Sequence, residues 1–155
     1  MLCGRLLWVG LMSSGDKELR KVGLKVTLPR IKVLQVLESA DPHHLTAEDV
    51  YRALVDSGEE VGLATVYRVL TQFESAGLVE RHNFDSGQAI FELARGGHHD
   101  HIVCVDCGHV LEFTDSIIEA QQDKIATRMG FELEDHSLYL YGRCKKKKCP
   151  NRDEP

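Results

Sequence analysis

Apolar residues in the N-terminal part of the chain recur at the spacing of α-helices. From Val66 to Phe73 they stand at positions i, i+3, i+4 and i+7, which predicts an amphipathic helix that ends at Gly77. Three earlier helices are predicted; one of them has Pro29 in its first turn, and the next opens on a capping-box-like Thr46. The apolar faces expected for these two helices consist of Ile31, Val33, Leu34 and Leu37, and of Val50, Ala53 and Leu54.

Two strand-like runs follow these helices. Residues 78–84 and 88–93 are joined by the turn sequence Asp-Ser-Gly and predict a β-hairpin. Helix, turn, helix and hairpin is the order of a winged helix, in which the second helix of the pair enters the major groove. The residues that would approach base edges are Ala64, Thr65, Tyr67 and Arg68. The alternative is a small structural helical domain whose Arg68 is merely solvated.

The chain changes character after a glycine pair. Gly96 and Gly97 predict a hinge over residues 94–97, because two adjacent glycines loosen the backbone. Beyond it the pattern predicts two strands, a helix and a last strand, at residues 102–105, 109–113, 116–129 and 131–141. The expected fold class is therefore α+β, with a winged helix at 12–93 and a small α/β domain at 98–155.

Charge and length narrow the functional classes. The 155 residues carry a formal net charge of −5, so the total charge does not indicate nucleic acid. A local basic cluster nevertheless could neutralise phosphates, although a solvated helix face explains it equally well. It consists of Lys17, Arg20, Lys21, Lys25, Arg30 and Lys32.

The apolar N-terminus calls for its own interpretation. The stretch from Leu6 to Met12 is far shorter than the roughly 20 residues of a membrane span, so we expect no span. It also lacks the preceding basic region and the small-residue cleavage site of a secretory signal. We therefore expect a cytoplasmic protein whose translation starts at Met12, with residues 1–11 a mis-annotated leader.

The cysteines predict a structural zinc site. Cys104 and Cys107 form one close pair, and Cys144 and Cys149 form another, so that four thiolates can close a tetrahedral shell around Zn²⁺. Such a staple suits a C-terminal domain that is small for independent stability. Disulfides are the alternative, but a reducing cytosol disfavours them. A redox-active cysteine pair is the other alternative, but such a pair would stand at a helix N-terminus, whereas Cys107 is expected in a turn between strands.

Residues 98–101, His-His-Asp-His, carry the densest metal-ligating chemistry in the chain. In an extended segment, alternation points His99 and His101 to one face and His98 and Asp100 to the other. One short segment could thus serve two metal sites. Imidazole with carboxylate suits Fe²⁺, Mn²⁺, Co²⁺ or Zn²⁺, so the ligand types alone leave the metal open.

Four sequence runs together resemble the ferric uptake regulator family, most of all its iron-responsive members. These runs lie at residues 23–30, 62–70, 98–101 and 136–142, and the resemblance extends from Asp16 to Cys149. It implies a repressor that binds double-stranded operator DNA as a homodimer, and in some cases as a tetramer, when loaded with Fe²⁺ or with Mn²⁺ as its substitute. It also implies an N-terminal winged helix and a C-terminal dimerisation domain.

The resemblance supplies ligands that spacing alone could not find. It implies a regulatory site of His44, Glu92, His99 and His101, with Glu112 nearby. It implies a second site of His98, Asp100, Glu119 and His136. In the zinc site, Cys104 and Cys107 would be firmer ligands than Cys144 and Cys149. For DNA it points to Tyr67 and Arg68 at bases or phosphates and to Lys25 at the minor groove.

The regulatory ligands would lie on both sides of the hinge, so a bound metal would fix the angle between the two domains. In a dimer that angle sets the spacing of the two recognition helices. A zinc- or peroxide-sensing repressor of the same family is the nearest alternative function. A zinc enzyme is the more distant one, because no His-x-Glu followed by Pro-Cys-x-x-Cys occurs in the chain.

Overall fold

A computed structural model describes residues 14–84, 87–95 and 97–145. The expected leader at residues 1–11, part of the hairpin turn, Gly96 of the expected hinge and Cys149 lie outside this range. The described residues form two compact units. Unit 1 comprises the chain up to Arg81 together with Ile90–Ala94, and unit 2 comprises His82–Ala89 with the chain from Arg95 onward. Residues 82–84 and 87–89, which belong to the predicted wing, thus cluster with unit 2.

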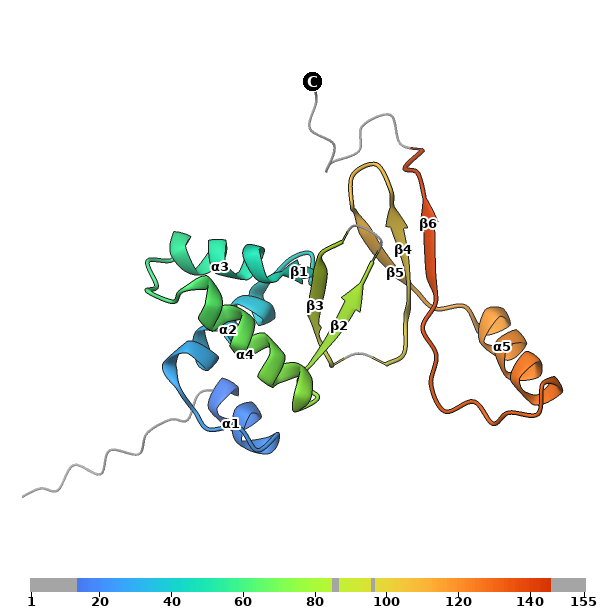
Figure 1. The fold of residues 1–155 in the computed structure, drawn as a ribbon, viewed down its shortest axis with the longest axis horizontal. Coiled ribbons are helices and arrows are strands. Elements are labelled where there is room, and N and C mark those ends of the chain that lie inside the picture. Colours follow the sequence, from blue (N-terminus) through green and yellow to red (C-terminus); the bar gives the residue numbers. More distant parts are fainter. Residues whose placement is uncertain (1–13, 85–86, 96, 146–155) are drawn as a thin grey trace, which may run out of the picture. The chain divides into compact units, whose positions relative to one another are not determined.

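Unit 1 is built from four helices around one apolar core (Figure 1). The helices are α1 (Ser14–Lys21), α2 (Leu28–Ser39), α3 (Ala47–Asp56) and α4 (Leu63–Ser75). The apolar face predicted for α4 is confirmed, because its four members are all buried: Val66, Val69, Leu70 and Phe73. Of the other expected core residues, Val33, Leu34, Leu37, Val50 and Leu54 are buried, whereas Ile31 and Ala53 are half-buried.

A small sheet accompanies the helices. The predicted hairpin is present as β2 (Val79–Asn83) and β3 (Ala89–Leu93). A third strand, β1 (Leu45–Thr46), pairs antiparallel with β3, and the sheet order is β1-β3-β2. The two residues of β1 are too few to show the alternation by which a strand is found in a sequence, so β1 was not expected.

Unit 2 is organised by a three-stranded sheet. It contains β4 (Asp100–Cys104), β5 (Val110–Phe113), α5 (Ser116–Arg128) and β6 (Tyr139–Gly142). The strand order is β5-β4-β6, with β4 antiparallel to β5 and parallel to β6. The predicted last strand over residues 131–141 is wrong in its first part, because only its end pairs with β4. The alternation of residues 131–135 reflects acidic side chains that remain exposed, not a half-buried strand.

Unit 2 exposes a set of large apolar side chains. No residue of α5 is buried, and Ile117 is 78% exposed. Other members of this exposed set are Ile102, Leu111, Ile125, Met129, Phe131 and Leu140. Within the part of the chain that the structure describes, no helix has the length and apolar character to cross a membrane.

The start of α3 gives a direct test of the local sequence signal. The Thr46 Oγ1 accepts a hydrogen bond from the Asp49 backbone N–H at 3.1 Å, and the Thr46 N–H donates to the Asp49 carboxylate at 3.0 Å. The predicted capping box is therefore confirmed. Replacing Thr46 by Ala should lower the free energy of unfolding by about 1 kcal/mol, because the first turn loses its acceptor. Chemical denaturation measures the loss, and Thr46→Ser, which keeps the hydroxyl, should recover most of it.

Candidate metal centres and nucleic-acid surface

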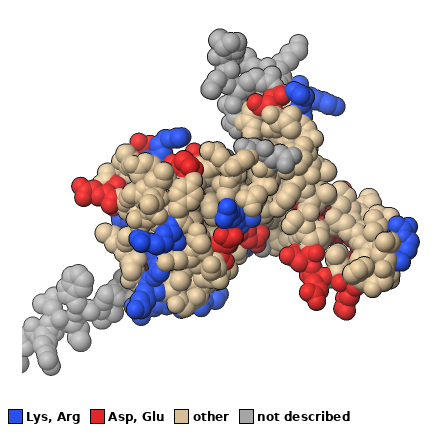
Figure 2. All heavy atoms as spheres, in the orientation of Figure 1, with Lys and Arg blue, Asp and Glu red and all other residues tan. Residues whose placement is uncertain are grey.

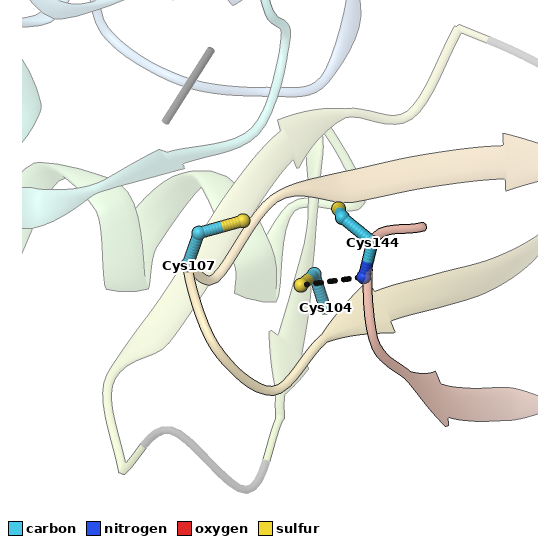
Figure 3. Close-up of side chains that lie close together, drawn as sticks. All are labelled: Cys104, Cys107 and Cys144. Carbon is cyan, nitrogen blue, oxygen red and sulfur yellow. Dashed lines mark hydrogen bonds between the residues drawn. The ribbon is translucent and has the colours of Figure 1, made fainter. Parts of the chain in front are cut away.

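Three of the four predicted zinc ligands lie together in unit 2 (Figure 3). Cys104 ends β4, Cys107 belongs to the turn that follows, and Cys144 comes after β6. Parallel pairing of β4 with β6 aligns Cys104 with Gly142, which brings Cys144 to the same end of the sheet. Their sulfur atoms all lie within 4.8 Å of one another. This sulfur cluster fits the soft, tetrahedral coordination of Zn²⁺.

The surroundings of Cys104 favour the thiolate form of its side chain. The Cys144 backbone N–H donates a hydrogen bond to the Cys104 Sγ at 3.3 Å (Figure 3). This hydrogen bond is the main cause that lowers the pKa of the Cys104 thiol to about 6, and further backbone N–H groups contribute. Since metals bind the thiolate, a lowered thiol pKa favours zinc at neutral pH.

The predicted second site is also assembled within unit 2. The His98 Nε2 lies 3.3 Å from the Asp100 carboxylate and 3.4 Å from that of Glu119. The His136 Nε2 lies 3.2 Å from the other oxygen of Glu119. These side chains come from the first residue of β4 and the segment just before it, from the first turn of α5 and from the segment between α5 and β6. Their ligand atoms all lie within 4.8 Å of one another.

Burial shows that this cluster fits a divalent cation. Asp100 is fully buried, yet neither of its carboxylate oxygens accepts a hydrogen bond from the described residues. One Glu119 oxygen likewise accepts no hydrogen bond from these residues, and the His136 Nε2 forms none with them. Burying a carboxylate without a donor or a cation is costly. Two imidazoles and two carboxylates match the ligand preferences of Fe²⁺, Mn²⁺ or Zn²⁺ and would balance the charge of a divalent ion.

Two predicted regulatory ligands belong to unit 1. The β1–β3 register pairs Leu45 with Phe91 and so carries His44 toward Glu92. The His44 Nε2 lies 3.0 Å from the Glu92 carboxylate, and both side chains are almost completely buried. A buried imidazole beside a buried carboxylate is a pair of metal ligands already in contact.

The other two regulatory ligands belong to unit 2. The rings of His99 and His101 lie 4.9 Å apart between centroids, and the His99 Nδ1 lies 3.0 Å from the Gly97 carbonyl oxygen. His101 is buried, and its ring packs 4.5 Å from that of His82 and 5.5 Å from that of Phe84. The predicted regulatory site therefore divides two and two between the units, and its assembly stays a prediction.

The residues predicted to meet DNA lie on unit 1. Tyr67 and Arg68 are exposed on α4, on the side away from its buried apolar face, and Thr65 is half-buried beside them. Lys25 is exposed in the segment between α1 and α2. Figure 2 shows Lys and Arg side chains gathered on unit 1 over α1 and its surroundings. This charge distribution suits a phosphate backbone.

Sequence reasoning missed Glu48 as a neighbour of this surface. The Tyr67 hydroxyl donates a hydrogen bond of 2.6 Å to the Glu48 carboxylate, which also raises the pKa of Tyr67. Glu48 lies in the first turn of α3, where an acidic residue already has a local reason to occur. No signal in the sequence distinguished its second contact from that ordinary role.

The lowered thiol pKa of Cys104 predicts an unusual alkylation profile. In metal-free, reduced protein, iodoacetamide labelling of Cys104 should rise with pH around a midpoint near 6, because the thiolate is the nucleophile. In urea-unfolded protein the midpoint should return to the ordinary range near 8.5. Peptide mass spectrometry reads each cysteine separately. An identical midpoint in folded and unfolded protein would contradict the hydrogen bond from Cys144.

The second cluster predicts a site-specific loss of metal. Glu119→Gln removes one charge and one ligand, so the bound metal should fall by about one ion per chain while cysteine-bound zinc stays. Asp123→Asn is the matched control, because it makes the same change at an exposed position of α5. Elemental analysis after Fe²⁺ or Mn²⁺ loading and desalting measures both. Equal metal content in the two variants would remove Glu119 from the site.

Comparison with known proteins identifies the family. The profile described as "Ferric uptake regulator family" matches residues 21–141. The ferric uptake regulation protein of Pseudomonas aeruginosa is 66% identical over 131 residues, which cover 84% of this chain and 98% of that protein.

Solved structures show the same fold. The crystal structure of the Vibrio cholerae ferric uptake regulator superposes with a TM-score of 0.78 at 54% identity, covering 83% of this chain and 98% of that one. The Francisella tularensis ferric uptake regulator with iron gives 0.76 at 46% identity, with 79% and 93% covered. The expected α+β fold with its N-terminal winged helix is confirmed, and this chain belongs to the ferric uptake regulator family.

Proposed function

We propose that this protein is a metal-dependent transcriptional repressor of iron homeostasis. It binds double-stranded operator DNA as a homodimer when loaded with Fe²⁺, for which Mn²⁺ can substitute, and such dimers can pair into tetramers. Zn²⁺ serves as its structural metal. It acts in the cytoplasm and catalyses no reaction. Membership of the ferric uptake regulator family and the names of its relatives support this function.

One observation carries the proposal. The predicted regulatory ligands divide between the units: His44 and Glu92 belong to unit 1, which bears the recognition helix, and His99 and His101 belong to unit 2. Each pair is already held within its own unit. A metal bound by all four side chains would require one defined arrangement of the two units. The coupling can be no larger than the difference in metal affinity between the competent and other arrangements.

The surface of α4 supports DNA as the partner. Tyr67 and Arg68 project from the exposed side of a helix whose opposite side is anchored in the core. In a winged helix this position faces the major groove, where a guanidinium can pair with guanine and a ring can contact thymine methyl groups. Thr65 stands two residues before Tyr67, nearer the N-terminus of the helix, and Lys25 supplies a cation from a separate segment.

The exposed apolar side chains of unit 2 support the dimer. Ile102 and Leu140 lie beside each other on β4 and β6, and both remain exposed. Ile117, Met129 and Phe131, at either end of α5, are each at least 66% exposed. A water-soluble domain rarely leaves so many large apolar side chains uncovered, and a second copy of the same surface would bury them.

The cysteine cluster and the second metal cluster both tie distant segments to β4. Cys104, Cys107 and Cys144, whose sulfur atoms lie together, would hold Zn²⁺ with the predicted fourth ligand Cys149 and fasten the segment after β6 to the end of β4. At the other end of β4, the ligands of the second cluster join α5 and the segment before β6 to the same strand. Bound metal supplies charge neutralisation and fixed ligand geometry at these points. The second cluster would thereby stabilise the domain that carries half of the regulatory ligands.

DNA binding under defined metal conditions tests the function. Fluorescence anisotropy with an iron-box-type palindrome should show tight binding only with Fe²⁺ or Mn²⁺ under anaerobic conditions, and chelation should release the DNA. The double variant His99→Ala/His101→Ala should lose at least about tenfold in affinity, because unit 2 then offers no regulatory imidazole. His43→Ala is the matched control, since His43 is exposed and is not a predicted ligand.

The possible outcomes separate the candidate functions. Activation by Zn²⁺ alone would replace iron sensing by zinc sensing. Metal-independent binding would contradict the regulatory site while leaving the DNA-binding surface intact. Failure to bind this palindrome in every metal state would contradict iron-responsive repression.

A further inference from the structure

Arg30 connects two segments that the proposed function brings to DNA. Its Nη1 donates a hydrogen bond of 2.7 Å to the main-chain carbonyl of Lys25. Its Nε and Nη2 donate bonds of 3.2 and 2.9 Å to the side-chain oxygen of Gln72, on α4. The two acceptors lie 47 positions apart in the sequence, and one guanidinium holds both. A planar guanidinium with several fixed donors is suited to such a tie, whereas a lysine ammonium is not.

The position of Arg30 in its helix favours this tie over a local role. Arg30 stands in the first turn of α2, which contains no acidic residue. A cation at a helix N-terminus faces the positive end of the helix dipole, so the local electrostatics are unfavourable. Arg30 is also only half-exposed, and three of its N–H groups point to protein oxygens. The contacts of its guanidinium, and not helix stability, therefore account for the arginine.

The segment that carries Lys25 has no regular secondary structure to fix its position. Residues 24–27 belong to no helix or strand. Farther along this side, Val22 and Leu24 line an open hollow together with Thr71, Gln72 and Ser75 of α4. Apolar packing across that hollow is incomplete. The hydrogen bonds of Arg30 therefore supply a direct link between the Lys25 segment and α4.

We propose that Arg30 is a positioning residue for DNA recognition: by tying the Lys25 carbonyl to Gln72, it fixes the minor-groove lysine relative to the major-groove helix. This inference rests on the proposed DNA-binding function. Minor-groove and major-groove contacts reinforce each other only when their spacing matches the duplex. Arg30 sets that spacing within one protomer, without touching DNA.

A double-mutant cycle between Lys25 and Gln72 tests the tie. Gln72→Met keeps the length of the side chain, removes the acceptor and changes no charge. Lys25→Ala in the otherwise unchanged protein should reduce the slope of log affinity against log salt concentration by about one. In the Gln72→Met background the same substitution should cost less, so that the double variant binds at least about threefold better than the product of the separate effects predicts. Holoprotein loaded with Mn²⁺ and the palindrome described above are used throughout.

Controls separate positioning from other roles. Gln121→Met makes the same chemical change at an exposed position of α5 and should leave the effect of Lys25→Ala unchanged. Arg30→Lys keeps the charge but cannot reproduce the planar tie, so it should behave like Gln72→Met. Thermal unfolding monitors the fold of every variant, and the coupling is read only from variants that unfold cooperatively.

Two results would overturn the inference. Additive effects of Lys25→Ala and Gln72→Met would show that the two groups act independently. A salt slope that falls in Arg30→Gln but not in Gln72→Met would show that Arg30 contacts a phosphate itself. Absence of DNA binding by the unsubstituted protein would instead refute the proposed function. The experiment thus distinguishes failure of that function from failure of the role inferred for Arg30.

Discussion

Hydrogen bonding of β4 to strands on both sides is the constraint on which the predicted metal sites of unit 2 depend. Antiparallel pairing with β5 and parallel pairing with β6 hold β4 extended along its whole length. Because side chains alternate along an extended strand, Asp100 and His101 are directed to opposite faces. At the far end of the strand, the same pairing with β6 delivers Cys144 to Cys104. One strand therefore contributes side chains to all three predicted metal sites.

Unit 1 instead carries polar groups on the surface of a small apolar core. Helix α4 is anchored by Val66, Val69, Leu70 and Phe73, so its opposite side faces outward. The polar contacts around that side are few and specific. Glu48 holds the Tyr67 hydroxyl, and Arg30 holds the Lys25 segment against Gln72. The shape of this surface depends on hydrogen bonds between groups that belong to different segments of the chain.

Local sequence signals account for the elements, but not for the contacts between them. Helical spacing located α4, and Thr46 with Asp49 located the start of α3, because both signals lie within one turn or a few turns. The two-residue β1 gave no signal, and the alternation of residues 131–135 imitated a strand that has no partner there. The alternation within residues 98–101 separated two pairs of predicted ligands from the sequence alone. Glu119 and His136 came only from the resemblance, since chain folding, and not spacing, brings them to Asp100.

The adjacency of Asp100 and His101 has an evolutionary consequence. A single residue inserted after His101, with the rest of β4 still paired as it is, would shift residues 98–101 by one position and exchange their side chains between the two faces. An imidazole would then replace the carboxylate at one cluster, and a carboxylate would replace the imidazole at the other. Individual substitutions impair one cluster at a time, whereas a change of length impairs both at once. Selection should therefore tolerate the substitution of one of these predicted ligands more readily than an insertion or a deletion within residues 98–101.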